Sequence, residues 1–337
     1  MLYALARSLL FRWDAEAAHD ITLKTLNAWE KFHFSQPSVL PTRPVQAMGL
    51  AFPNPLGLAA GLDKNGAYID ALARLGFGFI EIGTVTPQPQ PGNAKPRLFR
   101  LPEQQAIINR MGFNNCGVDQ LVENVKEARY RGILGINIGK NATTPIAQAL
   151  DDYRVCLQKV YPYASYVVTN ISSPNTQDLR SLQSVVRLDE LLNGLMQTRE
   201  QLAKTHGKTV PLVVKLAPDL ADEELGELAR VLVKHKIDAI IATNTTITRP
   251  GITFTGEGGL SGQPLKARSL AVLQRLKREL GDAIPLIASG GIMSAADAEE
   301  RLQAGASLVQ IYTGLIYQGP RLIADICRRL QSKQGEV

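Results

Sequence analysis

The 337-residue sequence predicts an α/β protein, a (βα)8 TIM barrel with an N-terminal helical extension. From about residue 55 onward, short apolar runs alternate with amphipathic stretches of helical period, and this unit occurs eight times in succession. Continuous apolar strands separated by helices are typical of a parallel sheet that helices cover. An open doubly wound sheet usually carries GxGxxG after its first strand, and this sequence lacks that motif. The repeat therefore favours a closed barrel.

The segment before the barrel has a different pattern, so we divide the chain into a module of residues 1–45 and a barrel of residues 46–337. Spaced apolar residues such as Leu5, Leu9 and Trp29 predict two short amphipathic helices in the module. Their apolar face could pack on the barrel as a cap, or it could contact lipid. Five basic and four acidic residues nearly balance, so lipid binding would come from apolar insertion. The pattern alone leaves both interpretations open.

The barrel units follow one another along the rest of the chain. The expected strands cover residues 55–61, 79–84, 132–140, 166–173, 211–218, 239–246, 285–292 and 308–314. The expected helices between them cover residues 68–75, 118–130, 188–204, 223–235, 267–280 and 295–304. More than thirty residues separate the second strand from its helix, and this stretch is rich in proline and ends in several asparagines at 109–115. Long loops on the C-terminal face of a barrel usually carry function, so we expect this one to do so.

Composition excludes several classes of function. The net charge of +6 is spread among acidic residues without a basic, aromatic stripe, so we expect no nucleic-acid partner. The three cysteines and four histidines are dispersed, which predicts neither disulfides nor a metal site. No apolar run is long enough to span a membrane as a helix, and no signal peptide is predicted.

Barrel enzymes carry their catalytic groups where the strands end on the C-terminal face. Here those ends carry amides, hydroxyls and two lysines, and none of them carries an acidic residue. Hydrolysis by paired carboxylates or by a metal would need acids there. The residues at the strand ends are Lys64, Thr84, Asn137, Asn170, Ser173, Lys215, Thr243, Asn244, Thr245, Gly290, Gly291, Tyr312, Thr313 and Gly314. This set suits a ligand that combines N–H and C=O groups with negative charge.

Four asparagines lie in three of these loops, at positions 109, 170, 175 and 244. An asparagine side chain offers a donor and an acceptor together, so it binds the edge of a ring imide at two points. A single buried asparagine most often caps a loop. Four of them on one predicted face favour ligand recognition.

Glycines end the seventh and eighth strands, and residues 258–262 add another glycine-rich loop. Backbone amides at this place in a barrel often bind phosphate, because glycine allows a close approach. Each run alone could be ordinary turn chemistry. Their position at the last two strands indicates a phosphorylated ligand or cofactor.

Ser173 precedes Pro174, which disfavours the helical region and holds the serine in an extended or turn conformation. No histidine is near it in the sequence, so it is a poor candidate for a hydrolytic nucleophile. It could be a structural turn residue. Alternatively, it accepts a proton in a dry site where ammonium groups favour the deprotonated form.

These strand ends resemble those of the dihydroorotate dehydrogenases, and specifically the membrane-associated class 2 enzymes. The motifs that carry the resemblance are residues 57–66, 109–115 and 170–176, with Gly290-Gly291 and Tyr312-Thr313 at the last strand ends. The resemblance covers the whole chain. It implies FMN as the cofactor, oxidation of (S)-dihydroorotate to orotate, and a membrane quinone as electron acceptor.

The resemblance also assigns roles to residues. It implies that Ser173 is the base, which takes the proton from C5 of the substrate while hydride leaves C6 for flavin N5. For FMN it implies Ala60, Lys64, Thr84, Asn137, Asn170, Lys215, Thr243, Gly262, Gly291, Tyr312 and Thr313. For the substrate it implies Lys64, Asn109, Arg110, Met111, Gly112, Phe113, Asn170, Asn175, Asn244 and Thr245.

Class 1 relatives use a cysteine base, so the serine indicates class 2. The resemblance favours a membrane-docking, quinone-admitting role for residues 1–45. We therefore expect a monomeric, peripheral membrane protein on the cytoplasmic face of a bacterial inner membrane. One departure concerns Gln177-Asp178, where the family commonly has a glycine before the Leu-Arg pair. Aspartate restricts positive φ, so we expect an altered shape or closing rate for the loop that carries Ser173.

Two other functions compete with this interpretation. One is a Schiff-base lyase that uses Lys215 or Lys64, which would form a borohydride-trapped adduct and have no yellow colour. The other is a membrane-recruited barrel that only binds a nucleotide. Such a protein would bind FMN, but dihydroorotate would not bleach it.

Overall fold

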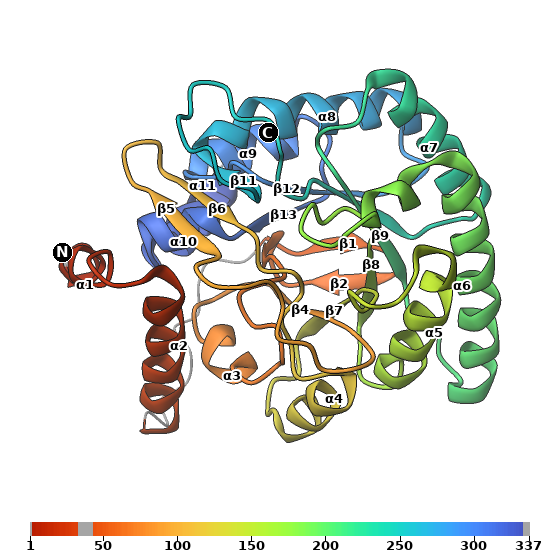
Figure 1. Ribbon diagram of the computed structural model, residues 1–337, viewed down its shortest axis with the longest axis horizontal. Helices are drawn as coiled ribbons and strands as arrows, with labels where there is room; N and C mark the ends of the chain where they lie inside the picture. Colours follow the sequence, from red (N-terminus) through yellow and green to blue (C-terminus); the bar gives the residue numbers. More distant parts are fainter. Residues whose placement is uncertain (1, 33–42, 333–337) are drawn as a thin grey trace.

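The structure is a computed structural model that describes residues 2–32 and 43–332. Its centre is a closed barrel of parallel strands surrounded by helices (Figure 1). The barrel strands are β3 (Leu56–Leu58), β4 (Phe79–Val85), β7 (Ile133–Ile138), β8 (Tyr166–Asn170), β9 (Leu212–Leu216), β10 (Ala239–Ala242), β12 (Leu286–Ser289) and β13 (Leu308–Ile311). They are neighbours in the order β10-β12-β13-β3-β4-β7-β8-β9. The predicted (βα)8 TIM barrel is confirmed, and each of the eight expected strands overlaps one of these, with β4 extending one residue beyond its expected end.

Helices follow the strands and cover the outside of the barrel. They are α3 (Ile69–Ala73), α4 (Val118–Glu127), α5 (Ala149–Val160), α6 (Val185–His206), α7 (Asp222–Lys234), α8 (Lys266–Leu280), α9 (Ala295–Gln303), α10 (Thr313–Gln318) and α11 (Arg321–Ser332). Short 3-10 turns are η1 (Ile146–Gln148), η2 (Leu179–Gln183) and η3 (Gln263–Leu265). The six helices expected from the sequence are all present, whereas α5, α10 and α11 were not among them.

An antiparallel hairpin closes the N-terminal end of the barrel. It consists of β1 (Val45–Ala47) and β2 (Leu50–Phe52). Phe52 is fully buried and meets Phe79 edge to face, with ring centroids 5.2 Å apart. Phe79 in turn meets Tyr166 across the barrel interior. Apolar and aromatic side chains therefore fill the lower barrel, and polar groups are left for the opposite end.

The long connection after β4 is not a plain loop. It forms β5 (Leu98–Leu101) and β6 (Ala106–Asn109), which pair with β11 (Gly259–Gly262) in a small antiparallel sheet. The pairing brings the loop after the second barrel strand against the loop after the sixth. Asn109 and Gly262 therefore belong to one sheet although they are far apart in the sequence.

The N-terminal helices are α1 (Leu2–Leu10) and α2 (Ala15–Phe32), which lie beside the barrel next to β5, β6 and α10 (Figure 1). Arg97, in the connection after β4, forms a two-point ion pair with Glu16 on α2. Its Nη2 donates to Oε1 at 2.7 Å and its Nε donates to Oε2 at 3.1 Å, and this contact holds α2 against the connection. The Tyr3 hydroxyl donates to the carbonyl of Ile316 on α10 at 2.7 Å. Residues 33–42 of the expected module lie outside the described residues. Strand β1 begins at residue 45, which is the expected last residue of the module.

The outer side of these helices is apolar and exposed. The exposed fraction is 67% for Leu5, 63% for Leu9 and 55% for Trp13, and Ile21 and Trp29 are exposed as well. Within residues 2–32 and 43–332, no helix combines the length and the apolar composition that crossing a membrane requires. The module is thus bound to the barrel by these polar contacts and by the packing of Phe11 and Leu23, and it turns other large apolar side chains outward.

Candidate active site

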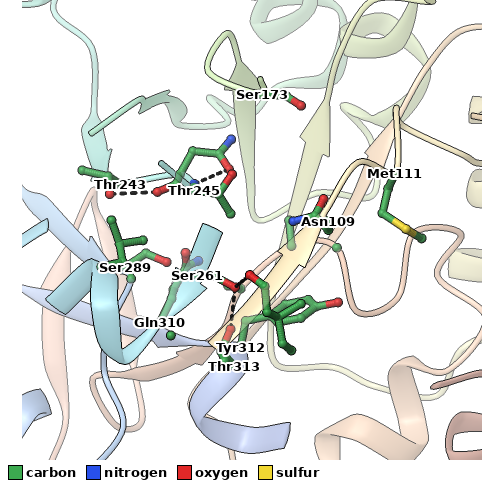
Figure 2. A pocket seen from close by; sticks show the side chains of 18 of the residues that line it. Asn109, Met111, Ser173, Thr243, Thr245, Ser261, Ser289, Gln310, Tyr312 and Thr313 are labelled. Atoms are coloured by element: carbon green, nitrogen blue, oxygen red, sulfur yellow. Dashed lines mark hydrogen bonds between the residues drawn. The ribbon is translucent and has the colours of Figure 1, made fainter. Parts of the chain in front are cut away.

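A cavity opens at the C-terminal ends of the barrel strands, between the barrel and the small sheet of β5, β6 and β11. It encloses about 1180 Å³ of space not filled by atoms, its open mouth included. Figure 2 shows Ser173 toward one end and Ser261, Tyr312 and Thr313 toward the other. Both the barrel strand ends and the inserted sheet contribute to its wall.

Most residues singled out from the sequence line this cavity. They are Ala60, Lys64, Thr84, Asn109, Met111, Gly112, Phe113, Asn170, Ser173, Asn175, Lys215, Thr243, Asn244, Thr245, Gly262, Gly291, Tyr312 and Thr313. Two expected residues do not reach the wall. Asn137 is fully buried beneath it and accepts a hydrogen bond from Thr84 Oγ1 at 2.6 Å. The Arg110 guanidinium donates to the carbonyl of Pro96 and is directed away from the cavity.

Several lining residues were missed by sequence reasoning, among them His19, Ser261, Ser289, Met293 and Gln310. A signal existed for Gln310, because it lies two residues before Tyr312 and strand side chains alternate between faces. His19 had no such signal. Its position depends on how α2 packs against the barrel.

Ser173 is buried, with 6% of its surface exposed, and it lines the cavity. Its Oγ accepts a hydrogen bond from the amide of Asn175, with the two atoms 3.3 Å apart. No side chain in the described part of the chain is hydrogen-bonded to Ser173 Oγ, so neither histidine nor carboxylate activates it as in a hydrolase. A serine hydroxyl in this setting faces the cavity free to exchange a proton with a ligand.

The four asparagines meet at the cavity in two pairs. Asn175 Nδ2 donates to Asn109 Oδ1 at 3.0 Å, which joins the loop after β8 to the end of β6. Asn244 Nδ2 lies 3.3 Å from Asn170 Oδ1. The pairs come from different loops of the same face. This arrangement supports the interpretation that these amides recognise a ligand rather than cap separate loops.

Lys64 follows β3 and lines the cavity close to α2. Burial lowers the pKa of its ammonium group to about 8, and the Arg97 charge acts in the same direction while Glu16 opposes it. The neighbouring His19 has a pKa lowered to about 4, chiefly by burial and then by the Lys64 charge. His19 is therefore neutral near pH 7, and Lys64 is the cation at this end of the cavity.

Lys215 on β9 supplies the second cation. Its side chain is buried, and burial lowers the pKa of the ammonium group while Glu81 opposes that shift. Glu81 Oε1 lies 3.9 Å from Lys215 Nζ, beyond hydrogen-bond distance. Neither this ammonium group nor that of Lys64 donates a hydrogen bond within the part of the chain that the structure describes. Both cations remain free to bind an anionic or carbonyl-bearing ligand.

Glycines shape the cavity wall at the end of β11 and just after β12. Gly262 and Gly291 have φ angles of +94° and +71°, which favour glycine. A Cβ on Gly291 would collide with the backbone of Lys266. Among the described residues, the amide of Gly291 has no hydrogen-bond acceptor. Thr313 Oγ1, which lies nearby, donates to Ser261 Oγ at 2.8 Å (Figure 2). A free backbone amide beside two hydroxyls suits the oxygens of a phosphate.

Arg180 fixes the loop that carries Ser173. Its Nε donates to the carbonyl of Ser172 at 3.0 Å, and its Nη2 donates to the carbonyl of Thr245 at 2.9 Å. Its Nη1 is paired with Asp219 at 2.7 Å. One guanidinium thus joins the loops after β8, β9 and β10 and holds the serine near the other strand ends.

Asp178 adopts the left-handed conformation, with φ 55° and ψ 2°. The loop therefore keeps a positive φ at this position although the residue is not glycine. Replacing Asp178 by glycine is expected to raise Tm by about 1–2 °C, because left-handed backbone costs a residue with a side chain more than it costs glycine. Thermal unfolding of the variant measures the shift. Asp222→Gly, an exposed change in helix α7, should instead lower Tm. A lower Tm for Asp178→Gly would contradict this account.

Comparisons with known proteins identify the family of the chain. Residues 44–333 match the family model described as dihydroorotate dehydrogenase. The chain is 60% identical over 334 residues to the dihydroorotate dehydrogenase (quinone) of Chromobacterium violaceum, covering 97% of each chain. It is 57% identical over 337 residues to that of Nitrosomonas eutropha, covering 99% of this chain and 98% of the relative. The dihydroorotate dehydrogenase of Eimeria tenella, solved with ferulenol, superposes with a TM-score of 0.88 at 38% identity, covering 96% of this chain and 92% of that one. The chain therefore belongs to the dihydroorotate dehydrogenase family.

Proposed function

We propose that this chain is a quinone-dependent dihydroorotate dehydrogenase, which oxidises (S)-dihydroorotate to orotate in pyrimidine biosynthesis. One observation carries the proposal beyond family membership. A buried serine without a catalytic partner lies in one cavity with two ammonium groups that donate no hydrogen bond to a described residue and with two pairs of asparagines. A cyclic imide that bears a carboxylate matches this set of donors, acceptors and charges.

The cofactor in this proposal is FMN, bound once per chain. The cavity residues fit that group, because the free amide of Gly291 and the hydroxyls of Thr313 and Ser261 form a cradle for a phosphate. The buried Lys215 ammonium has no hydrogen-bond partner among the described residues, which suits a flavin carbonyl or ring nitrogen. The residues proposed to hold FMN are Ala60, Lys64, Thr84, Asn137, Asn170, Lys215, Thr243, Gly262, Gly291, Tyr312 and Thr313.

Tyr312 and Asn137 need a comment within that set. Burial raises the pKa of Tyr312 to about 12, so it contributes a neutral phenol at the cavity wall. Asn137 lies below the wall and would act on the flavin through Thr84, which it orients. FMN, when bound, supplies the acceptor for the hydride that leaves C6 of the substrate.

Ser173 takes the proton from C5 of dihydroorotate in this proposal. Its hydroxyl accepts only the amide of Asn175, and that donor together with the nearby lysines favours the deprotonated oxygen. The substrate is held by the asparagine pairs, by Lys64 and by the loop of Asn109. The residues proposed to contact it are Lys64, Asn109, Arg110, Met111, Gly112, Phe113, Asn170, Asn175, Asn244 and Thr245. Among these, Arg110 would act through the loop backbone, since its guanidinium is bound to Pro96.

The second substrate is a membrane quinone, which we propose enters beside α1 and α2. His19 and Lys64 lie where α2 meets the cavity, so a path along this helix leads to the flavin site. The exposed apolar residues of residues 1–45 support peripheral contact with lipid on the cytoplasmic face of a bacterial inner membrane. We propose that the active unit is a monomer.

Replacing Leu5 and Leu9 together by glutamate is expected to reduce binding to phospholipid vesicles at least about tenfold, because each leucine would lose its apolar insertion. Reduction of vesicle-borne quinone should fall with it, whereas flavin reduction by dihydroorotate should not change. Sedimentation with vesicles and stopped-flow absorbance measure the two quantities. Val186→Glu on α6 is the matched control, because Val186 and Leu5 are each 67% exposed. Equal losses for the control and the α1 variant would rule out a membrane role for these leucines.

The proposed activity is tested by incubating purified protein with (S)-dihydroorotate and a short-chain quinone analogue. Orotate should form in step with quinone reduction, and heat-released cofactor should have the mass of FMN. Released FAD, or quinone reduction without orotate, would contradict the proposal.

A further inference from the structure

Glu81 is a buried carboxylate in the barrel core that the steps above do not use. It lies on β4, two residues after Phe79, and none of its surface is exposed. The aromatic side chains of Phe79 and Tyr166 belong to the apolar cluster that fills the lower barrel. Glu81 is thus placed at the border between this apolar filling and the polar wall of the cavity. A carboxylate so far from water needs compensating partners.

The neighbours of Glu81 are all donors. Asn137 Nδ2 donates to Oε1 at 2.9 Å, Gln310 Nε2 donates to Oε2 at 2.6 Å, and the Tyr166 hydroxyl donates to Oε2 at 3.3 Å. Lys215 Nζ lies 3.9 Å from Oε1. A carboxyl group surrounded only by donors acts as an acceptor, which is the role of its ionised form. The negative charge of Glu81 therefore lies directly below the ammonium group of Lys215.

The contact with Asn137 begins a chain of oriented hydrogen bonds. Because Asn137 turns its amide nitrogen to Glu81, its Oδ1 is left to accept from Thr84 Oγ1 at 2.6 Å. Thr84 Oγ1 then accepts from Asn170 Nδ2 at 2.9 Å. Asn170 Oδ1 is left to accept from Asn244 Nδ2 at 3.3 Å. Each amide in this chain takes the orientation that the one below it requires.

The chain ends at side chains that line the cavity. Thr84, Asn170 and Asn244 are part of its wall, as are two further polar partners of Glu81, Gln310 and Lys215. Gln310 and Ser289 are seen side by side in the wall in Figure 2. The amide nitrogen of Gln310 donates to Glu81, and this fixes which way the amide points. Its Oε1 is buried and has no hydrogen-bond partner among the described residues. Glu81 thus orients several lining amides from below, while Ser172 contacts the upper end of the chain through Asn170 Oδ1 and through Asn244 Nδ2 at 3.0 Å.

We propose that Glu81 is a positioning residue for the flavin and substrate sites. Its charge offsets the ammonium group of Lys215, and its acceptor oxygens set the orientation of Gln310 and of the chain from Asn137 to Asn244. The inference rests on the proposed function, since it assigns Glu81 a role toward bound flavin and dihydroorotate.

The test compares Glu81→Gln with Tyr166→Phe as flavin-loaded proteins. Glu81→Gln keeps the shape of the side chain but removes its charge. It also replaces one carboxylate oxygen by an NH2 group, which then faces the donor of either Asn137 or Gln310. Tyr166→Phe removes one neutral contact and keeps the charge. We expect Glu81→Gln to shift the midpoint potential of the flavin to a more positive value, because a negative charge beneath it is lost. Its Kd for orotate, titrated by the visible spectrum of the oxidised protein, should rise about tenfold.

Tyr166→Phe should leave both the midpoint potential and the orotate Kd unchanged. Glu81→Gln with a potential and a Kd equal to those of Tyr166→Phe would overturn the proposal. If Glu81→Gln does not fold, the double variant Glu81→Gln with Lys215→Met should restore folding, because no unpaired buried charge remains. Circular dichroism and thermal unfolding of the flavin-free proteins measure this, and a double variant as unstable as Glu81→Gln would also overturn the proposal. The spectrum of the unmodified protein is recorded first, and a colourless protein would refute the proposed function itself.

Discussion

Replacing Ser173 by alanine is expected to slow reduction of the bound flavin by dihydroorotate about 10²–10⁴-fold, the usual contribution of a positioned general base. The serine is the one residue of its loop whose hydroxyl lies in the cavity wall with only a backbone amide as partner. Without it, the proton at C5 of the substrate loses the acceptor that this proposal assigns to it. Flavin content should not change, because the residues of the phosphate cradle are at the other end of the cavity (Figure 2).

Anaerobic stopped-flow absorbance measures this rate directly. Ser181→Ala is the matched control, because Ser181 lies in the next turn of the same loop and bonds to the carbonyl of Asp178 rather than lining the cavity. The control should reduce its flavin at the unmodified rate. If Ser173→Ala also reduced its flavin at the unmodified rate, the base would be another residue.

Replacing Lys64 by methionine is expected to raise the KM for dihydroorotate about 10–100-fold. Hydrogen bonds to a charged group contribute about 1.5–3 kcal/mol, and about 1.4 kcal/mol corresponds to a tenfold change in affinity. Methionine keeps the length and the apolar stem of the side chain, so the change isolates the charge. Lys204→Met, at an exposed ion pair on α6, serves as the control and should leave KM unchanged.

The same residue predicts a pH dependence. The pKa of Lys64 is about 8, and a lysine is charged below its pKa and neutral above it. The charged fraction is nearly complete at pH 6.5 and falls about tenfold per pH unit above pH 8, so KM should rise in that direction. The charges facing Lys64 are those of Glu16, Asp20, Asp63 and Arg97, and His19 is neutral there with a pKa of about 4. Steady-state kinetics between pH 6.5 and 9.5 should show the rise in the unmodified protein and its absence in Lys64→Met. The same rise in both proteins would assign the titration to another group.

The sequence predicted the barrel because each strand is a nearly continuous apolar run, and burial on both faces demands such runs. Except for residues 79–84, which end one residue before the end of β4, the predicted strands were too long at their ends. The run at 55–61, for example, contains β3 as only Leu56–Leu58, because the chain leaves the sheet where the cavity begins. Helix α5 was missed although Tyr153, Cys156 and Val160 are buried with helical spacing. The strands β1 and β2 have three residues each, too few for any periodicity to be visible.

The site was predicted as far as it depends on strand ends, because chain order alone places those ends on one face of a barrel. Glu81 and Gln310 were not predicted, since they lie below the ends and matter through contacts across the barrel. The packing of α2 and the pairing of β6 with β11 also depend on tertiary contacts that no local pattern encodes. Asp178 adopts the left-handed conformation, so the positive φ that aspartate was expected to restrict is present, and an altered closing rate of the loop stays a prediction.

The most direct test of the central claim is the visible spectrum of the purified protein before and after anaerobic addition of (S)-dihydroorotate. The account predicts a yellow protein whose flavin absorbance bleaches as one orotate forms per flavin, and whose colour returns when a quinone is added. A protein without flavin absorbance, or one whose flavin dihydroorotate does not bleach, would contradict it.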